Sequence, residues 1–340
     1  MNTALSRRSF LMAATAALIA AAKWPLIAAT KSPLIAAAKS PAAQVTDPRQ
    51  PTVDTSGPQE IGDGVWVVPD HRIWLVPNIG IIIGRDAALV VDTGLGPANG
   101  ERVLDLARRL SGARKLFLTV THFHPEHGYG AQVFRRDAAI VYNRAQRDEL
   151  AEKGARYVDL FRQTQSPATV AALDGTEIVM PHFVYDGAST EIDLGGRKVE
   201  LRHWGLAHTR GDQTVFLPEE RILFVGDLIE ERMFPIFPWF PPSDTEVDGR
   251  RWVSILREFE KLDPSVIVPG HGERGPIKIA RDLASHIETV GREVRMLRLQ
   301  GKSAEDIIRE YKPEIVAAFP GWEHPGLLDW EINYFASLVR

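Results

Sequence analysis

The sequence contains no cysteine among its 340 residues. This absence excludes disulfide bonds, thiolate metal ligands and a cysteine nucleophile. The chain also lacks the Gly-x-Ser-x-Gly motif that carries the nucleophile of many serine hydrolases. Stability must therefore come from the packed core and from any metal that the chain binds.

An excess of positive charge is also absent, since the formal net charge is −4. The first 40 residues contain five of the 40 basic residues and no acidic residue, which leaves 35 basic against 44 acidic side chains, a net charge of −9. A mildly acidic surface disfavours nucleic acid as a partner. We expect a small-molecule substrate instead.

The N-terminus has the pattern of an export signal. Two arginines occur in Ser6-Arg7-Arg8-Ser9-Phe10-Leu11, and an alanine-rich apolar run continues to Ala22. This run is shorter than the roughly 20 residues that span a membrane. The pattern predicts transport by the twin-arginine export machinery to the periplasm or beyond, without a permanent membrane anchor. The alternative is a basic helical N-terminus of a cytosolic protein.

A low-complexity segment follows the signal. Between Pro25 and Pro41 the motif Pro-Leu-Ile-Ala-Ala repeats after eight residues, and a helix does not easily continue through prolines at this spacing. Residues 44–60 have the composition of a solvated linker. We therefore divide the chain into an export signal and spacer (1–40), a linker (41–60), a folded domain (61–290) and a helical C-terminal extension packed on it (291–340).

The folded part alternates apolar runs with amphipathic segments, which predicts an α/β fold of sheets covered by helices. The expected strands are 65–68, 79–83, 87–91, 116–120, 138–142, 199–204, 213–217, 221–225 and 265–268. The expected helices are 99–110, 143–163, 276–298, 303–311 and a short C-terminal segment, and 131–134 has the pattern of a short helix start.

Histidines cluster directly after the apolar run 115–120. His122, His124 and His127, together with Glu126, occur within six residues. Residues two apart on extended backbone point the same way, so His122 and His124 can bind one ion together. Imidazole and carboxylate are ligands that suit zinc. The cluster predicts a metal site at the carboxyl end of a strand.

Four other apolar runs end in similar side chains. They are followed by Asp92, His208, Asp227 and His271. Each alone is weak evidence, because Asp and His are common in turns. Strand ends at one edge of a sheet meet, however, so together these residues indicate a shared site.

These motifs resemble, in order and type, those of the metallo-β-lactamase-fold hydrolases, over about residues 60–290. The resemblance implies a four-layer αββα sandwich with two divalent metal ions, expected to be zinc, at one edge. It implies that His122, His124 and His208 hold the first ion, that Glu126, His127 and His271 hold the second, and that Asp227 bridges the two. It also implies a structural role for Asp92, which supports the histidine-rich loop without binding metal.

One residue departs from the family pattern. The family usually has Asp where this chain has Glu126, whose carboxylate extends one methylene further. The distance from a ligand atom to its metal ion varies by only about 0.2 Å around the usual value. The second ion is therefore expected to bind less firmly, or to be another metal. In the alternative, Glu126 orients His127 and does not bind metal.

The expected activity follows from this chemistry. Bound divalent metal lowers the pKa of water to about 7 and thereby supplies hydroxide near neutral pH. Such a hydroxide attacks an ester, lactone, thioester or amide carbonyl, with Glu126 or Asp227 transferring the proton. The alternatives are a β-lactamase and a non-catalytic periplasmic protein that binds a metal or redox cofactor.

The segment 233–242 combines four aromatic residues with four prolines. Phe237, Trp239 and Phe240 are candidates for an apolar substrate wall beside the metals, or for a loop packed under the C-terminal helices. The remaining histidines are expected to be solvated or satisfied within the fold, with lining of the pocket as the alternative for His71 and His203. These are His71, His182, His203, His286 and His324.

Overall fold

The computed structural model describes residue 47 and residues 49–242 and 244–339. The predicted export signal and spacer, residues 1–40, lie outside the described residues. No helix in the described ranges is both long enough and apolar enough to cross a membrane.

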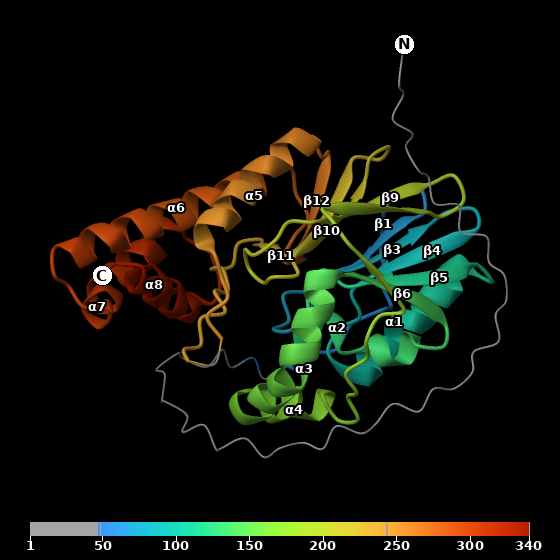
Figure 1. The fold of residues 1–340 in the computed structure, drawn as a ribbon, viewed down its shortest axis with the longest axis horizontal. Helices are drawn as coiled ribbons and strands as arrows, with labels where there is room; N and C mark the ends of the chain where they lie inside the picture. Colours follow the sequence, from blue (N-terminus) through green and yellow to red (C-terminus); the bar gives the residue numbers. More distant parts are fainter. Residues whose placement is uncertain (1–46, 48, 243, 340) are drawn as a thin grey trace, which may run out of the picture. The chain divides into compact units, whose positions relative to one another are not determined.

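Two sheets carry the strands of the described residues (Figure 1). The first sheet has the order β1 (Gln59–Gly62), β2 (Val65–Val68), β3 (Ile79–Ile83), β4 (Ala87–Val91), β5 (Lys115–Thr119), β6 (Ala138–Asn143) and β7 (Phe183–Tyr185). The second has the order β12 (Val266–His271), β11 (Ile222–Glu230), β10 (Gln213–Leu217), β9 (Lys198–His203) and β8 (Ser189–Asp193). Pairing is parallel from β4 to β7 and between β11 and β12, and antiparallel elsewhere.

Helices connect and cover these strands. They are α1 (Gly96–Ser111), α2 (Pro125–Gly128), α3 (Arg144–Thr164), α4 (Pro167–Ala172), α5 (Gly249–Leu262), α6 (Lys278–Leu299), α7 (Ala304–Ala318) and α8 (Leu328–Ser337), with 3₁₀ turns η1 (Ala131–Phe134) and η2 (Pro325–Leu327). Asp248 caps the N-terminus of α5, and its carboxylate accepts hydrogen bonds from the backbone N–H groups of Arg250 and Arg251.

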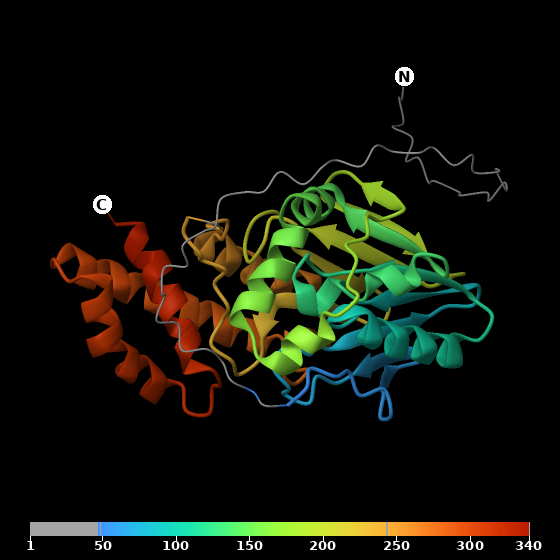
Figure 2. The same ribbon diagram turned by 90° about the horizontal axis from the view of Figure 1, so that it is seen from below.

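Three apolar clusters separate four layers. Successive side chains of a strand point to opposite faces, and both faces of the central strands are buried here. On β4, Leu89 belongs to the cluster between the sheets and Val90 to the cluster under α1 and α3. On β11, Phe224 faces the first sheet and Leu223 faces the cluster formed with α5, α6 and α8. The predicted αββα sandwich is confirmed, and Figure 2 shows its layers from a second side.

The structure corrects two of the predicted boundaries. Val53, placed in the linker 41–60, is fully buried, and its N–H donates to Asn99 Oδ1. Strand β1 also begins inside that segment, so packed structure starts before residue 61. The predicted boundary between residues 290 and 291 falls inside the continuous helix α6. The C-terminal helices share one apolar cluster with β11 and α5, and therefore continue the main core.

A buried ion cluster joins α3 to the loop that follows β11. Lys153 on α3 is 2% exposed. Its Nζ lies 2.9 Å from Glu149 Oε1, 3.0 Å from Asp244 Oδ1 and 2.7 Å from Glu246 Oε2. Tyr157, one turn further along α3, donates a hydrogen bond of 2.9 Å to Asp244 Oδ2. Helix α3 therefore fixes the position of Asp244 and Glu246, which lie between β11 and α5.

Replacement of Lys153 tests this anchor. Lys153→Ala removes the cation nearest to the buried carboxylates of Glu149 and Asp244 and leaves them with the weaker, longer contacts to Arg210 and Arg156, which we expect to lower the free energy of unfolding by about 3 kcal/mol. Denaturant unfolding followed by circular dichroism measures the change. The control Lys278→Ala breaks an exposed i,i+4 pair with Asp282 and should leave the unfolding free energy nearly unchanged. Equal losses in the two variants would contradict the anchoring role.

Candidate metal centre

The predicted ligands come from loops and strand ends of both sheets. His122 and His124 lie between β5 and α2, and Glu126 and His127 lie on α2. On the second sheet, His208 lies in the loop between β9 and β10, Asp227 on β11 and His271 at the end of β12. All seven residues are buried or nearly so, with His271 the most exposed at 7%.

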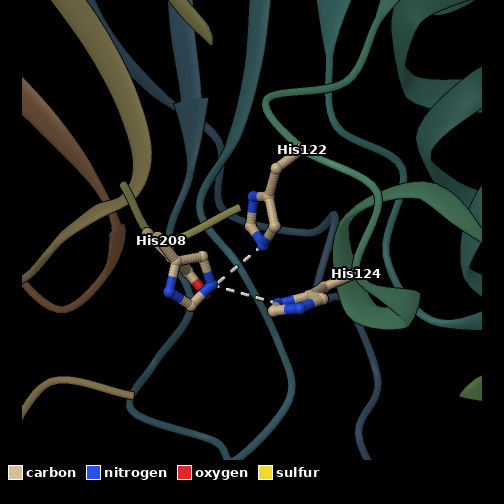
Figure 3. Close-up of side chains that lie close together, drawn as sticks. His122, His124 and His208 are labelled. Carbon is tan, nitrogen blue, oxygen red and sulfur yellow. Dashed lines mark hydrogen bonds and ion pairs between the residues drawn. The ribbon is translucent and has the colours of Figure 1, made fainter. Parts of the chain in front are cut away.

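The first ligand group consists of His122, His124, His208 and Asp227. One donor atom from each lies within 4.8 Å of the others. Figure 3 shows the three imidazole rings converging on one point. His124 Nδ1 and His208 Nε2 are 3.1 Å apart. Ligands bound tetrahedrally to one zinc at about 2.0–2.1 Å lie about 3.3 Å apart, so this spacing suits a shared ion.

The second group consists of Glu126, His127, Asp227 and His271, again with donor atoms within 4.8 Å of one another. Asp227 belongs to both groups. Its Oδ1 lies 3.1 Å from His127 Nε2 and 3.6 Å from His271 Nε2. Its Oδ2 lies 3.7 Å from His122 Nε2 and 3.9 Å from His208 Nε2. One carboxylate oxygen therefore faces each group, which is the arrangement of a bridging ligand.

Unsatisfied polar atoms show that the residues fit a metal. His122 Nε2, Glu126 Oε2 and both carboxylate oxygens of Asp227 are buried without a hydrogen-bond partner among the described residues. Buried polar atoms without partners are costly and therefore rare. Cations bound between these lone pairs would satisfy all of them together.

The electrostatics of the histidines in the first ligand group agree with cation binding. Burial, followed by the positive charges of neighbouring histidines, lowers the pKa of His122 well below its usual value, and burial lowers the pKa of His208 to about 4. Both rings are therefore neutral near pH 7, the form that binds metal. Burial opposes ionisation of Asp227, yet the charges of His127 and His271 hold its pKa well below the usual range. Burial raises the pKa of Glu126, against the opposing effect of His127.

Asp92 supports the histidine-rich loop and lies outside both ligand groups. Its Oδ1 accepts a 2.7 Å hydrogen bond from the Thr121 backbone, and its Oδ2 lies 2.9 Å from His127 Nδ1. This contact turns the other ring nitrogen of His127 toward Asp227. Asp92 is therefore the residue that orients His127. Glu126 does not have this role, and its carboxylate lies in the second ligand group.

A glycine makes room for the bridging carboxylate. A Cβ at Gly270, on β12, would lie 2.0 Å from Asp227 Oδ1. Any side chain at this position would displace Asp227 from between the two groups. The sequence pattern Pro269-Gly270-His271 thus provides both the space and a ligand.

The first group has supporting residues that sequence reasoning missed. Asp212 accepts hydrogen bonds from the backbone N–H groups of His208 and Thr209 and so fixes the loop. His208 Nδ1 lies 3.0 Å from the carbonyl oxygen of Ile236, which directs Nε2 toward the site. The Tyr157 ring stacks on His124 at a centroid distance of 5.4 Å. Tyr157 lies in a charged helix with no motif, so no local sequence signal marks it.

The aromatic segment packs largely against the C-terminal helices. Phe237 is fully buried, with its ring 5.2 Å from those of Trp252 and Tyr334. Trp239 contacts Tyr334, and Phe240 contacts Trp330. Phe237 is therefore part of a loop packed under the C-terminal helices, which was the alternative to a substrate wall. The substrate wall stays a prediction for the partly exposed Trp239 and Phe240.

The other histidines divide into two kinds. His182 Nδ1 accepts the Ile140 N–H, His203 contacts the Arg210 carbonyl, His286 pairs with Glu331, and His71 is exposed. His324 is different, because it lies beside the metal centre and lines a cavity with His271. Its contacts are long-range, so the sequence around it carries no signal of this position.

Comparison with known proteins identifies the family. The model of the metallo-beta-lactamase superfamily matches residues 72–271, more than half of the chain. The chain belongs to the metallo-β-lactamase superfamily, and it is a metal-dependent hydrolase of that superfamily.

Individual relatives are distant. The acyl-coenzyme A thioesterase MBLAC2 of Bos taurus is 26% identical over 251 residues, covering 68% of this chain and 87% of that protein. The structure of the sec-alkylsulfatase Pisa1 from Pseudomonas sp. aligns with a TM-score of 0.61 and 14% identity, covering 83% of this chain and 50% of that chain. The structure of a metallo-β-lactamase from Pontibacter korlensis aligns with a TM-score of 0.52 and 19% identity, covering 67% of this chain and 98% of that chain. The two structural matches show the fold alone.

The role of Asp92 gives a prediction about metal affinity. Asp92 has a positive φ of 66°, a conformation that Asn tolerates, so Asp92→Asn should keep the backbone. Loss of the carboxylate that orients His127 should weaken metal binding by about 10–100-fold. Competition with a chromogenic chelator measures the affinity. The control Asp137→Asn alters an exposed ion pair with Arg108 and should bind metal normally. Unchanged affinity in Asp92→Asn would remove this role.

Proposed function

We propose that the protein hydrolyses a carbonyl compound, namely an ester, lactone, thioester or amide, with two divalent ions held by the two ligand groups. The observation that carries the proposal is Asp227, which places one carboxylate oxygen toward each group of buried, unpaired donors. The similarity to an acyl-coenzyme A thioesterase supports the thioester and ester members of this class.

The bound ions would supply Lewis-acid chemistry and would lower the pKa of water near the carbonyl. The protein residues supply orientation and proton transfer. His122, His124 and His208 present neutral rings from both sheets, and Asp92 keeps His127 in one tautomer. The low exposure of these residues excludes bulk water and strengthens every charge interaction in the site.

Two carboxylates in the ligand groups are candidates for proton transfer. The charges of His127 and His271 hold the pKa of Asp227 well below its usual range, so Asp227 is the weaker base of the two. Glu126 has a pKa raised by burial, so a proton is more stable on its carboxyl group than on a free glutamate. This difference favours Glu126 as the group that returns the proton to the leaving atom.

A substrate panel tests the function. Purified protein with measured metal content is assayed with p-nitrophenyl acetate, a lactone, an acyl thioester, nitrocefin and bis-p-nitrophenyl phosphate. We expect hydrolysis of an ester, lactone or thioester that stops with chelator and returns with zinc. Asp227→Asn should lower kcat by about 10²–10⁴-fold, whereas the exposed Asp282→Asn should not.

Other outcomes of the panel favour other functions. Hydrolysis of nitrocefin alone would indicate a β-lactamase, and hydrolysis of the phosphodiester alone would indicate two-metal phosphate chemistry. Stoichiometric metal without turnover of any substrate would favour the non-catalytic metal or cofactor-binding protein.

We also propose that the protein acts in the periplasm or outside the cell. The support is the pair Arg7-Arg8 ahead of a short apolar run. Replacement of both arginines by lysine should keep the full chain in the cytoplasmic fraction, as measured by fractionation and immunoblotting. The control replaces Lys31 and Lys39 by arginine and should be exported normally. Equal export of both variants would contradict the proposal.

A further inference from the structure

The C-terminal part of the chain reaches the metal centre through the segment 321–326. The backbone N–H of Phe234 donates to the carbonyl of Glu323 at 3.1 Å, and the N–H of Glu323 donates to the carbonyl of Arg232 at 2.9 Å. Residues 232–234 follow shortly after β11, the strand that carries Asp227. Backbone hydrogen bonds therefore fix Glu323 and His324 beside the site.

Glu323 and His324 line a cavity together with His271. The cavity has a volume of about 20 Å³, and Arg72 and Trp74 form another part of its lining. This volume holds about one water molecule. His271, the most exposed ligand residue at 7%, lies on this cavity, and Glu323 and His324 form the wall beside it.

The side chain of His324 packs against Trp74 at this cavity. Its ring centroid lies 4.8 Å from that of Trp74. The residue has φ 57° and ψ 53°, an uncommon left-handed conformation for a residue with a side chain. Conformations of this kind occur often at ligand sites. The backbone and the indole together place the imidazole at the cavity.

The charge of the cavity wall is negative. Arg72 Nη2 lies 2.6 Å from Glu231 Oε2, and Nη1 lies 3.4 Å from Glu323 Oε2. Asp70 adds a third carboxylate to the lining, and its Oδ2 accepts the Gly272 N–H. One guanidinium against three carboxylates disfavours a negatively charged group at this wall.

We propose that His324 and Glu323 determine substrate specificity: His324 limits the size of the acyl group that lies over His271, and Glu323 disfavours negative charge on it. This inference rests on the proposed carbonyl hydrolase. The substrate class is then an ester or thioester with a short, uncharged acyl group.

Chain-length profiles test the role of His324. We expect the kcat/KM of the wild type to fall from p-nitrophenyl acetate to butyrate to octanoate. His324→Ala should raise the octanoate-to-acetate ratio of kcat/KM at least about tenfold, mainly through KM. His324→Asn keeps a residue that tolerates the left-handed backbone and should shift the ratio in the same direction. The control His71→Ala also replaces a histidine with positive φ, outside the cavity lining, and should keep the wild-type profile.

A second comparison tests the charge of Glu323. Glu323→Gln should raise kcat/KM for the p-nitrophenyl monoester of glutaric acid relative to neutral p-nitrophenyl pentanoate by several-fold. The control Glu310→Gln changes a carboxylate on α7 that pairs with Arg309 and should leave this ratio unchanged.

Failure of the inference and failure of the proposed function are distinguishable. Chelator-sensitive hydrolysis by the wild type, with unchanged chain-length and charge profiles in metal-loaded His324 and Glu323 variants, would overturn the inference alone. Absence of chelator-sensitive hydrolysis in the wild type would overturn the proposed function and this inference with it.

Discussion

Asp227 is the side chain on which the arrangement of the site depends. It is 1% exposed, and its two oxygens face two separate sets of imidazoles. An ionised carboxylate at this depth requires positive charge on both sides to offset its lost hydration. Gly270 on the neighbouring strand leaves space for this carboxylate, since a Cβ there would lie 2.0 Å from Asp227 Oδ1. The pairing of β11 with β12 therefore brings the bridging Asp227 and His271 together.

The same centre connects the two sheets of a chain that has no disulfide to do so. Four ligand residues come directly after β5 of the first sheet. The other three lie on strands of the second sheet or in the loop after one of them. Metal binding to such a set contributes directly to folding free energy, because the unfolded chain does not hold the donors together. The ion cluster around Lys153 acts nearby, since it ties α3 to the loop whose Ile236 carbonyl orients His208.

Sequence reasoning was most successful where local pattern decides structure. The strands at 65–68, 79–83, 87–91 and 213–217 match their predicted bounds, because dense β-branched and apolar residues mark strands buried on both faces. The edge strand β8 escaped prediction, because of its five residues only Ile192 is buried. Helix α5 was also missed, although its apolar residues at 252, 253, 255, 256 and 259 form one buried face. The linker prediction placed Val53 in solvent, because the contact of Val53 with Asn99 spans 46 residues.

For the site, the sequence identified donors but not the residues that orient or surround them. His122, His124 and His127 are recognisable because they cluster, and the resemblance supplied the partners at other strand ends. Tyr157 and Asp212 act through packing and backbone hydrogen bonds, which leave no motif in the sequence. His324 meets Trp74 across 250 positions of the chain, a contact that only the tertiary fold creates.

The family match covers the metal ligands but not the whole wall around them. It ends at His271, whereas the lining of the adjacent cavity continues to Glu323 and His324. Trp74 packs against both outer apolar clusters, one under α1 and α3 and the other under the C-terminal helices. A change in the packing of α7 or α8 would therefore be transmitted to the approach to His271. The metal ligands in this fold lie at the sheet edges, while the size and charge of the acyl group that can reach them are, on our proposal, set by Glu323 and His324 in the segment between α7 and η2.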